Sequence, residues 1–294
     1  MVLLLRIVTA LVLLGIVAGS LYVSPTAFYA VMGVAFFAAL YEWLRLAQLP
    51  RGKAALLTAV DAALFTTLPF VVYTTIIETG TGRQLVVLLA AGVAFLTVCA
   101  LVWTVLAVRV FFARKTGMQV SFRASCALGL FLVPTAWLSL VVTNELFSLP
   151  FLLSVLLIVW CADVMAYFTG MTLGRHKMCP AISPKKSWEG VAGALVSVVV
   201  FGYLAGVYFE KHFTFPILSL EFGGFLLWAA LSVALVLFSI AGDLFESVLK
   251  RQVNIKDSGR LLPGHGGFFD RLDAMMPTLP VALLFSLVLG WFYY

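Results

Sequence analysis

Residues 222–246 read FGGFLLWAALSVALVLFSIAGDLFE, and no charged side chain occurs among them before Asp243. A helix needs about 20 mostly apolar residues to cross the hydrocarbon core of a bilayer, so this stretch predicts a membrane-spanning helix that ends in acidic residues. Similar runs recur along the chain of 294 residues, of which 63% are hydrophobic and 11% are charged. Soluble domains carry about 25% charged residues. The composition therefore predicts an all-α, polytopic transmembrane protein.

Nine stretches are long and apolar enough to span a membrane. Their approximate bounds are 2–22, 26–44, 54–77, 84–108, 124–143, 149–170, 190–209, 222–246 and 274–293. The first stretch also has features of a signal peptide, because Arg6 precedes an apolar run. It is long and lacks a clear small-residue cleavage site, which favours a retained span.

The basic residues alternate between successive loops. They fall at the N-terminus and in the loops after the second, fourth, sixth and eighth stretches, and only Arg83 and Lys211 of the 19 Lys and Arg residues lie elsewhere. Cytoplasmic loops of membrane proteins are enriched in Lys and Arg. The distribution therefore predicts a cytoplasmic N-terminus, and it explains the net charge of +6 without a nucleic-acid partner.

The acidic residues inside the predicted spans or at their inner edges include Asp61, Asp163, Asp243 and Glu246. A carboxylate in a bilayer is costly, and it generally lines a cavity or pairs with a cation. For Asp61 we favour a structural carboxylate that is hydrogen-bonded to a neighbouring helix. Asp163 and Asp243 differ, because each adjoins one of two long basic loops, 171–189 and 247–273.

The loop 247–273 reads SVLKRQVNIKDSGRLLPGHGGFFDRLD. Asp270 and Asp273 stand three residues apart at the predicted start of the last span, where a helix N-terminus favours anions. Glycines let backbone amides approach a phosphate, and Mg²⁺ binds carboxylate and phosphate oxygens together. The segment therefore indicates phosphate chemistry with Mg²⁺. A solvated basic loop whose acids pair with its bases, or a patch that binds anionic lipid, remains an alternative.

The loop 171–189 repeats this combination of charges. Ser183-Pro184 prevents a helix from continuing, and Glu189 can lie in the first turn of the next span. Lys185 and Lys186 then fall at the membrane surface, where the phosphate of a lipid would lie. The chain has neither a Walker A motif nor a dinucleotide-binding motif, so a bound nucleotide would not use a soluble nucleotide fold.

The segment 247–273 resembles the signature of the phosphatidate cytidylyltransferase family, whose members are also called CDP-diacylglycerol synthases. That signature runs S-x-x-K-R, four residues, K-D, a short spacer and H-G-G-x-x-D-R-x-D. It is met by Ser247, Lys250, Arg251, Lys256, Asp257, His265, Gly266, Gly267, Asp270, Arg271 and Asp273. Residues 163–170, 183–190 and 242–243 also resemble family patterns.

The resemblance implies an integral-membrane cytidylyltransferase that forms CDP-diacylglycerol and pyrophosphate from CTP and phosphatidate in phospholipid biosynthesis. The implied catalytic residues are Asp243, Lys250, Arg251, Asp270 and Arg271. The implied substrate-binding residues are Asp163, Tyr167, Lys185, Lys186, Ser187, Ser247, Lys256, His265, Gly266 and Gly267. The implied Mg²⁺ ligands are Asp243, Asp270, Asp273 and Asp257, with a monovalent cation such as K⁺ beside the magnesium ion.

These expectations define two regions: N-terminal transmembrane helices at 1–145, and a C-terminal catalytic region at 146–294 that carries both basic loops. The expected partners are CTP, phosphatidate and the lipid bilayer, with no nucleic acid, and the expected assembly is a homodimer. The expected location is the inner cell membrane, with the active site on the cytoplasmic side.

Two other functions remain open. A CTP-dependent polyprenol or phytol kinase would instead transfer the γ-phosphate of CTP to an alcohol. A transporter for an anionic solute would need charges near the bilayer midplane, whereas here the charges crowd the predicted cytoplasmic edge. The complete signature favours the cytidylyltransferase.

Overall fold

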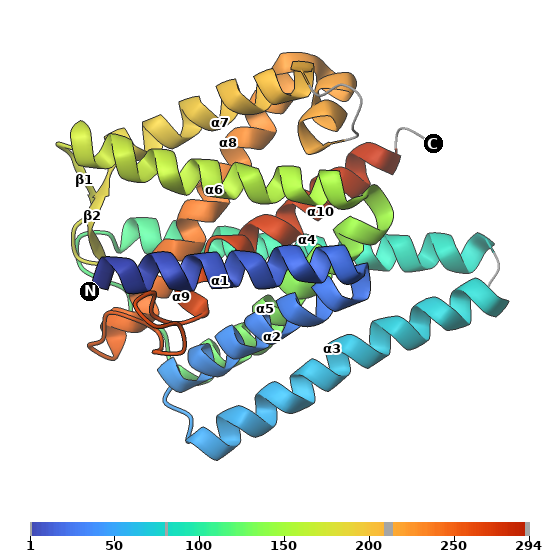
Figure 1. Cartoon of the computed structure of the whole chain (residues 1–294), viewed down its shortest axis with the longest axis horizontal. Helices are drawn as coiled ribbons and strands as arrows, with labels where there is room; N and C mark the ends of the chain where they lie inside the picture. Colours follow the sequence, from blue (N-terminus) through green and yellow to red (C-terminus); the bar gives the residue numbers. More distant parts are fainter. Residues whose placement is uncertain (1, 80–81, 209–213, 292–294) are drawn as a thin grey trace. The chain divides into compact units, whose positions relative to one another are not determined.

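The computed structural model describes residues 2–79, 82–208 and 214–291 (Figure 1). The elements are α1 (Val2–Val23), α2 (Pro25–Leu46), α3 (Arg51–Thr79), α4 (Gly82–Phe112), α5 (Phe122–Phe147), α6 (Leu149–Thr172), β1 (Lys177–Cys179), β2 (Ser183–Ser187), α7 (Trp188–Tyr208), α8 (Phe215–Gln252), α9 (Phe269–Leu272) and α10 (Met275–Trp291). Each predicted span coincides with one long helix, so the all-α architecture is confirmed. Lys211 and the last residues of the ninth predicted span lie outside the described residues.

Seven of the described helices are long and apolar enough to cross a membrane. They are α2, α4, α5, α6, α7, α8 and the continuous stretch Phe269–Gly290. In α1 only the shorter segment Val8–Val23 qualifies as apolar, and α3 does not meet the criterion over its described residues. Helices satisfy their backbone hydrogen bonds internally, which lipid requires. The chain is therefore a polytopic membrane protein, while the predicted count of nine spans and the cytoplasmic N-terminus stay predictions.

The chain forms two units, each assembled from three separate segments. One unit comprises Met1–Thr81, Gln119–Leu138 and Leu249–Asp273. The other comprises Gly82–Met118, Ser139–Val248 and Ala274–Tyr294. Distant parts of the sequence therefore share each unit, and the two units are described separately below.

In the first unit, the buried Trp43 joins α2 to two other segments. Its indole ring stacks on Phe269 of α9, with 4.8 Å between the ring centroids. Its Nε1 donates a hydrogen bond to the carbonyl oxygen of Ser125 at 2.9 Å. Gly129 leaves room for the indole, because a Cβ there would lie 2.9 Å from Trp43 Cδ1. This packing fixes α9, and with it the end of the signature segment, against α2.

In the second unit, α6 and α7 run side by side, and the β1–β2 hairpin lies at one end of the pair (Figure 1). Small residues allow this close approach: a Cβ on Gly190 would lie 2.8 Å from the carbonyl oxygen of Ala166. The predicted loop 171–189 thus contains an antiparallel hairpin, with Lys177 opposite Ser187. Its strands are too short to give a periodic sequence pattern. The prediction that Glu189 lies in the first turn of the next helix is confirmed.

A short break separates two helices, α9 and α10, at the start of the last predicted span. Asp270 lies in the first turn of the four-residue helix α9, Asp273 follows that helix, and the long helix α10 starts only at Met275. The prediction that both aspartates stand at the start of the last span is confirmed, since that span runs over Phe269–Gly290. Asp270 bonds back to the N–H group of Gly267, as acidic residues do in the first turn of a helix, and this interaction marks a separate helix start.

Candidate active site

Asp270 is held at both carboxylate oxygens by residues of the signature segment. Its Oδ1 lies 2.7 Å from Lys250 Nζ. Its Oδ2 accepts hydrogen bonds from the backbone N–H groups of Ser258, at 2.9 Å, and Gly267, at 2.8 Å. The Ser258 hydroxyl is also 2.9 Å from this oxygen. The fold thus brings together two residues, Lys250 and Asp270, for which the sequence predicts catalytic roles.

The turn that precedes Asp270 depends on glycine. Gly264 and Gly266 have φ angles of +77° and +84°, in the left-handed region that glycine adopts most easily. A Cβ on Gly266 would lie 2.6 Å from Asp270 Oδ2. Since Asp270 also binds the N–H of Gly267, this turn packs directly against the aspartate. His265, between the two left-handed glycines, has a buried Nδ1 with no hydrogen-bond partner among the described residues.

A hollow of about 450 Å³ lies beside this turn and is lined by residues 255–260. Lys256 and Asp257 contribute exposed side chains of opposite charge to its wall. Arg251 and Arg271 are also exposed, and each donates a hydrogen bond to a backbone carbonyl of this segment, that of Ile255 and that of His265 respectively. Lys256 and Asp257 of the signature thus line the hollow, while Arg251 and Arg271 are exposed elsewhere on the same segment.

In the second unit, Lys186 of β2 pairs with Asp243 of α8. Lys186 Nζ lies 2.8 Å from Asp243 Oδ2, and the two side chains are 23% and 35% exposed. The residues are distant in sequence: Lys186 belongs to the basic loop 171–189, and Asp243 adjoins the basic loop 247–273. The ion pair therefore brings the hairpin to the acidic end of the long helix, where both groups remain accessible to a substrate.

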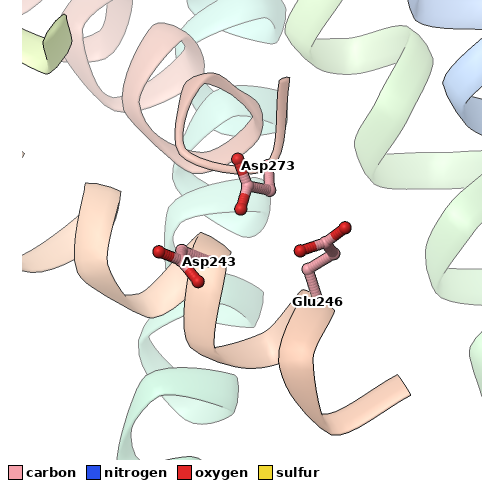
Figure 2. A group of neighbouring side chains, drawn as sticks. All are labelled: Asp243, Glu246 and Asp273. Atoms are coloured by element: carbon pink, nitrogen blue, oxygen red, sulfur yellow. The ribbon is translucent and has the colours of Figure 1, made fainter. Parts of the chain in front are cut away.

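Two carboxylates at the acidic end of α8, Asp243 and Glu246, could serve as ligands of a metal ion (Figure 2). Asp243 and Glu246 lie one turn apart on the same helix, α8, and Glu246 is buried. Carboxylate oxygens are the donors that Mg²⁺ prefers. The sequence analysis identified Glu246 as an acid at a membrane edge but did not assign it to the metal site. Its spacing of three residues from Asp243 is the signal that points to it.

Ser187 is buried at the start of α7 rather than open to solvent. Its hydroxyl oxygen accepts the N–H of Gly190 at 3.2 Å. A Cβ on Gly174 would lie 2.7 Å from this oxygen, and Gly170 is similarly close. Nearby, His176 Nδ1 lies 2.6 Å from Glu189 Oε1, a contact between the residue before β1 and the first turn of α7 that sequence reasoning missed. Ser187 and this pair both fasten the hairpin to α7.

The remaining predicted site residues are dispersed. Asp163 and Tyr167 occupy the exposed side of α6, four residues apart. Lys185 is exposed on β2, and Ser247 is buried in α8. Their predicted roles in substrate binding stay predictions.

Comparison with known proteins matches residues 4–289 to the cytidylyltransferase family. The chain therefore belongs to this family, and it is an enzyme that transfers cytidylyl groups. It is 35% identical to a phosphatidate cytidylyltransferase of Pseudomonas aeruginosa, over 97% of each chain. It is 42% identical to one of Haemophilus influenzae, over 44% of this chain and 43% of the relative. It is 40% identical to one of Thermotoga maritima, over 47% of this chain and 50% of the relative.

Proposed function

We propose that the enzyme transfers the cytidylyl group of CTP to phosphatidate and so forms CDP-diacylglycerol and pyrophosphate for phospholipid biosynthesis. The names of its relatives support this reaction. The observation that carries the proposal is the ion pair between Lys186 and Asp243, because it joins a basic hairpin to an acidic helix end in a membrane protein. A lipid phosphate and a metal-bound nucleotide need such charges side by side.

In the proposed reaction, a phosphate oxygen of phosphatidate attacks the α-phosphorus of CTP. A new bond forms between that oxygen and the α-phosphorus, the bond from the α-phosphorus to the next bridging oxygen breaks, and pyrophosphate leaves with the electron pair. The attacking oxygen is already anionic near neutral pH, so the reaction requires no strong base. Catalysis then depends on alignment and on neutralisation of charge.

The basic residues supply that neutralisation. Arg251 and Arg271 have exposed guanidinium groups that can bind phosphate oxygens, and Lys256 lines the hollow formed by residues 255–260. Lys250 acts from a buried position through its ion pair with Asp270. Lys186 is half-buried at the hairpin and is placed to bind the phosphate of the lipid once its contact with Asp243 loosens.

The donor set fits Mg²⁺. Asp243 and Glu246 on α8 offer carboxylate oxygens, the ligand type that a hard divalent cation takes, and the resemblance implies Asp273 as a further ligand. When bound, Mg²⁺ would neutralise phosphate oxygens of CTP. Asp270 and Asp257 belong to the proposed ligands as well, and we propose a monovalent cation such as K⁺ beside the magnesium ion. We further propose a homodimer in the inner membrane, with its active site facing the cytoplasm.

The test is a product assay with the purified protein in lipid nanodiscs that contain phosphatidate. CTP labelled at the α-phosphate and Mg²⁺ are expected to give labelled CDP-lipid and an equal amount of pyrophosphate, and EDTA is expected to stop both. Release of CDP with a phosphorylated alcohol would indicate a kinase instead. Absence of turnover with phosphatidates of several acyl chains and with several divalent metals would overturn the proposal.

A further inference from the structure

Glu42 is a buried carboxylate whose partners all lie in the signature segment, more than 200 residues further along the chain. The residue stands near the end of α2 and is 3% exposed. Its Oε2 accepts hydrogen bonds from the Ser258 hydroxyl and from the backbone N–H of Phe269, both at 2.9 Å. A carboxylate is costly to bury unless it is hydrogen-bonded, and these contacts satisfy Oε2, whereas Oε1 is buried without a hydrogen-bond partner among the described residues.

The segment closes tightly around this carboxylate. A Cβ on Gly259 would lie 2.1 Å from Glu42 Oε1, and a Cβ on Gly267 would lie 2.2 Å from Glu42 Oε2. The backbone therefore approaches the Glu42 carboxylate at both Gly259 and Gly267, at distances that leave no room for a Cβ atom. Phe269, which donates to Glu42, also stacks on Trp43, the next residue of α2.

Through Ser258 the carboxylate of Glu42 is connected to Asp270. The Ser258 hydroxyl lies 2.9 Å from both Glu42 Oε2 and Asp270 Oδ2, and the Ser258 N–H donates to Asp270 as well. Phe269 immediately precedes Asp270 in the chain. Glu42 thus fixes two of the groups that determine where the Asp270 carboxylate lies, although it is not itself part of the signature.

We propose that Glu42 is a positioning residue of the cytidylyltransferase site. It acts by accepting hydrogen bonds from Ser258 and Phe269, and thereby holds the 257–270 turn and Asp270 in the arrangement that catalysis requires. The inference rests on the proposed function for its catalytic consequence only. The hydrogen bonds themselves are independent of the reaction, so they can be tested separately.

The first arm of the test measures amide hydrogen exchange in Glu42→Leu, which has similar size but accepts no hydrogen bond. Exchange at Ser258 and Phe269 is expected to accelerate about tenfold or more, while α1, α2 and α10 keep their protection. Unchanged exchange at Ser258 and Phe269, or an equal rise throughout the protein, would overturn the positioning role.

The second arm measures turnover per folded molecule. Glu42→Leu is expected to lower kcat by about 10- to 100-fold, as small displacements of catalytic groups do. Glu42→Gln keeps an acceptor oxygen and is expected to recover most of the activity, whereas Glu221→Gln, at an exposed position of α8, serves as the control. A Gln variant as impaired as the Leu variant would overturn the inference. If the wild-type protein makes no CDP-lipid, the proposed function fails, and the exchange arm still decides the role of Glu42.

Discussion

Lys250 Nζ lies 2.7 Å from Asp270 Oδ1, and the two side chains are only 11% and 7% exposed. Withdrawing both charges from water costs free energy that their attraction repays only when each keeps its partner. A pair of apolar residues would fill the same space without this cost. The retention of the two charges is explained by the phosphate chemistry proposed for the site, and it makes the pair sensitive to the loss of either member.

Replacing Lys250 with methionine should therefore destabilise the protein. The variant leaves Asp270 buried without its cation, and we expect the free energy of unfolding to fall by about 3–5 kcal/mol. Thermal unfolding in detergent would measure this change. Lys256→Met, which removes a cation from an exposed position of the same segment, should change stability by no more than about 0.5 kcal/mol. Equal stability of the two variants would contradict the structural role of the pair.

The proposed metal ligands can be distinguished by their response to magnesium. Asp243→Asn and Glu246→Gln each remove a carboxylate from the acidic end of α8, so we expect each variant to need about tenfold more Mg²⁺ for half-maximal activity. The measurement is a Mg²⁺ titration of the product assay for each variant, with Glu221→Gln as the matched control. A magnesium requirement that rises for Asp257→Asn but not for Glu246→Gln would assign the metal to the 257–273 segment instead.

The close approach of α6 and α7 should not tolerate a methyl group. In Gly190→Ala the new Cβ would lie 2.8 Å from the Ala166 carbonyl oxygen, so the two helices must separate. We expect a loss of about 1–3 kcal/mol in stability, together with reduced turnover because the neighbouring hairpin carries Lys186. Gly92→Ala in α4 is the control, since nothing lies within 4 Å of its Cβ. If both alanine variants behaved alike, the packing argument would fail.

The thiol of Cys179 should be unreactive near neutral pH. Burial raises the pKa of the Cys179 thiol, and the nearby cations Lys186 and Arg114 lower that pKa by less. Because the thiolate is the reactive form, alkylation should be slow at pH 7 and should accelerate at a higher pH than for an ordinary cysteine. The measurement is the rate of maleimide labelling in a variant whose other three cysteines are alanine, with the SDS-unfolded protein as the reference. Labelling at the unfolded rate would show that β1 is not packed as described.

Much of the fold follows from the sequence because lipid imposes a simple rule. Any long apolar run must become a helix, so 222–246 and its counterparts identify the long helices correctly. The rule says nothing about short polar segments. The β1–β2 hairpin was missed because strands of this length leave no periodic signal, and the separate turn α9 was missed because Asp270 forms a local hydrogen bond that hydropathy does not register.

The sequence identifies residues of the candidate site only where they lie close together along the chain. The signature places Lys250, Asp257 and Asp270 in one segment, and spacing along a helix could have added Glu246 to Asp243. Glu42 could not be found in the same way, because its partners Ser258 and Phe269 lie at the other end of the chain. Two weaker signals were available: Glu42-Trp43 resembles the family in the N-terminal half, and a glutamate within an apolar helix generally needs a partner.

Thr9 of α1 donates a hydrogen bond through its hydroxyl to the carbonyl oxygen of Pro263, at 2.9 Å. Pro263 stands immediately before the left-handed glycines of the turn that packs against Asp270. Purification tags and reporter fusions are commonly attached ahead of the first helix of a membrane protein. In this enzyme, any such addition that shifts α1 would also disturb the turn that packs against Asp270, and a kinetic study should confirm its rates on untagged protein.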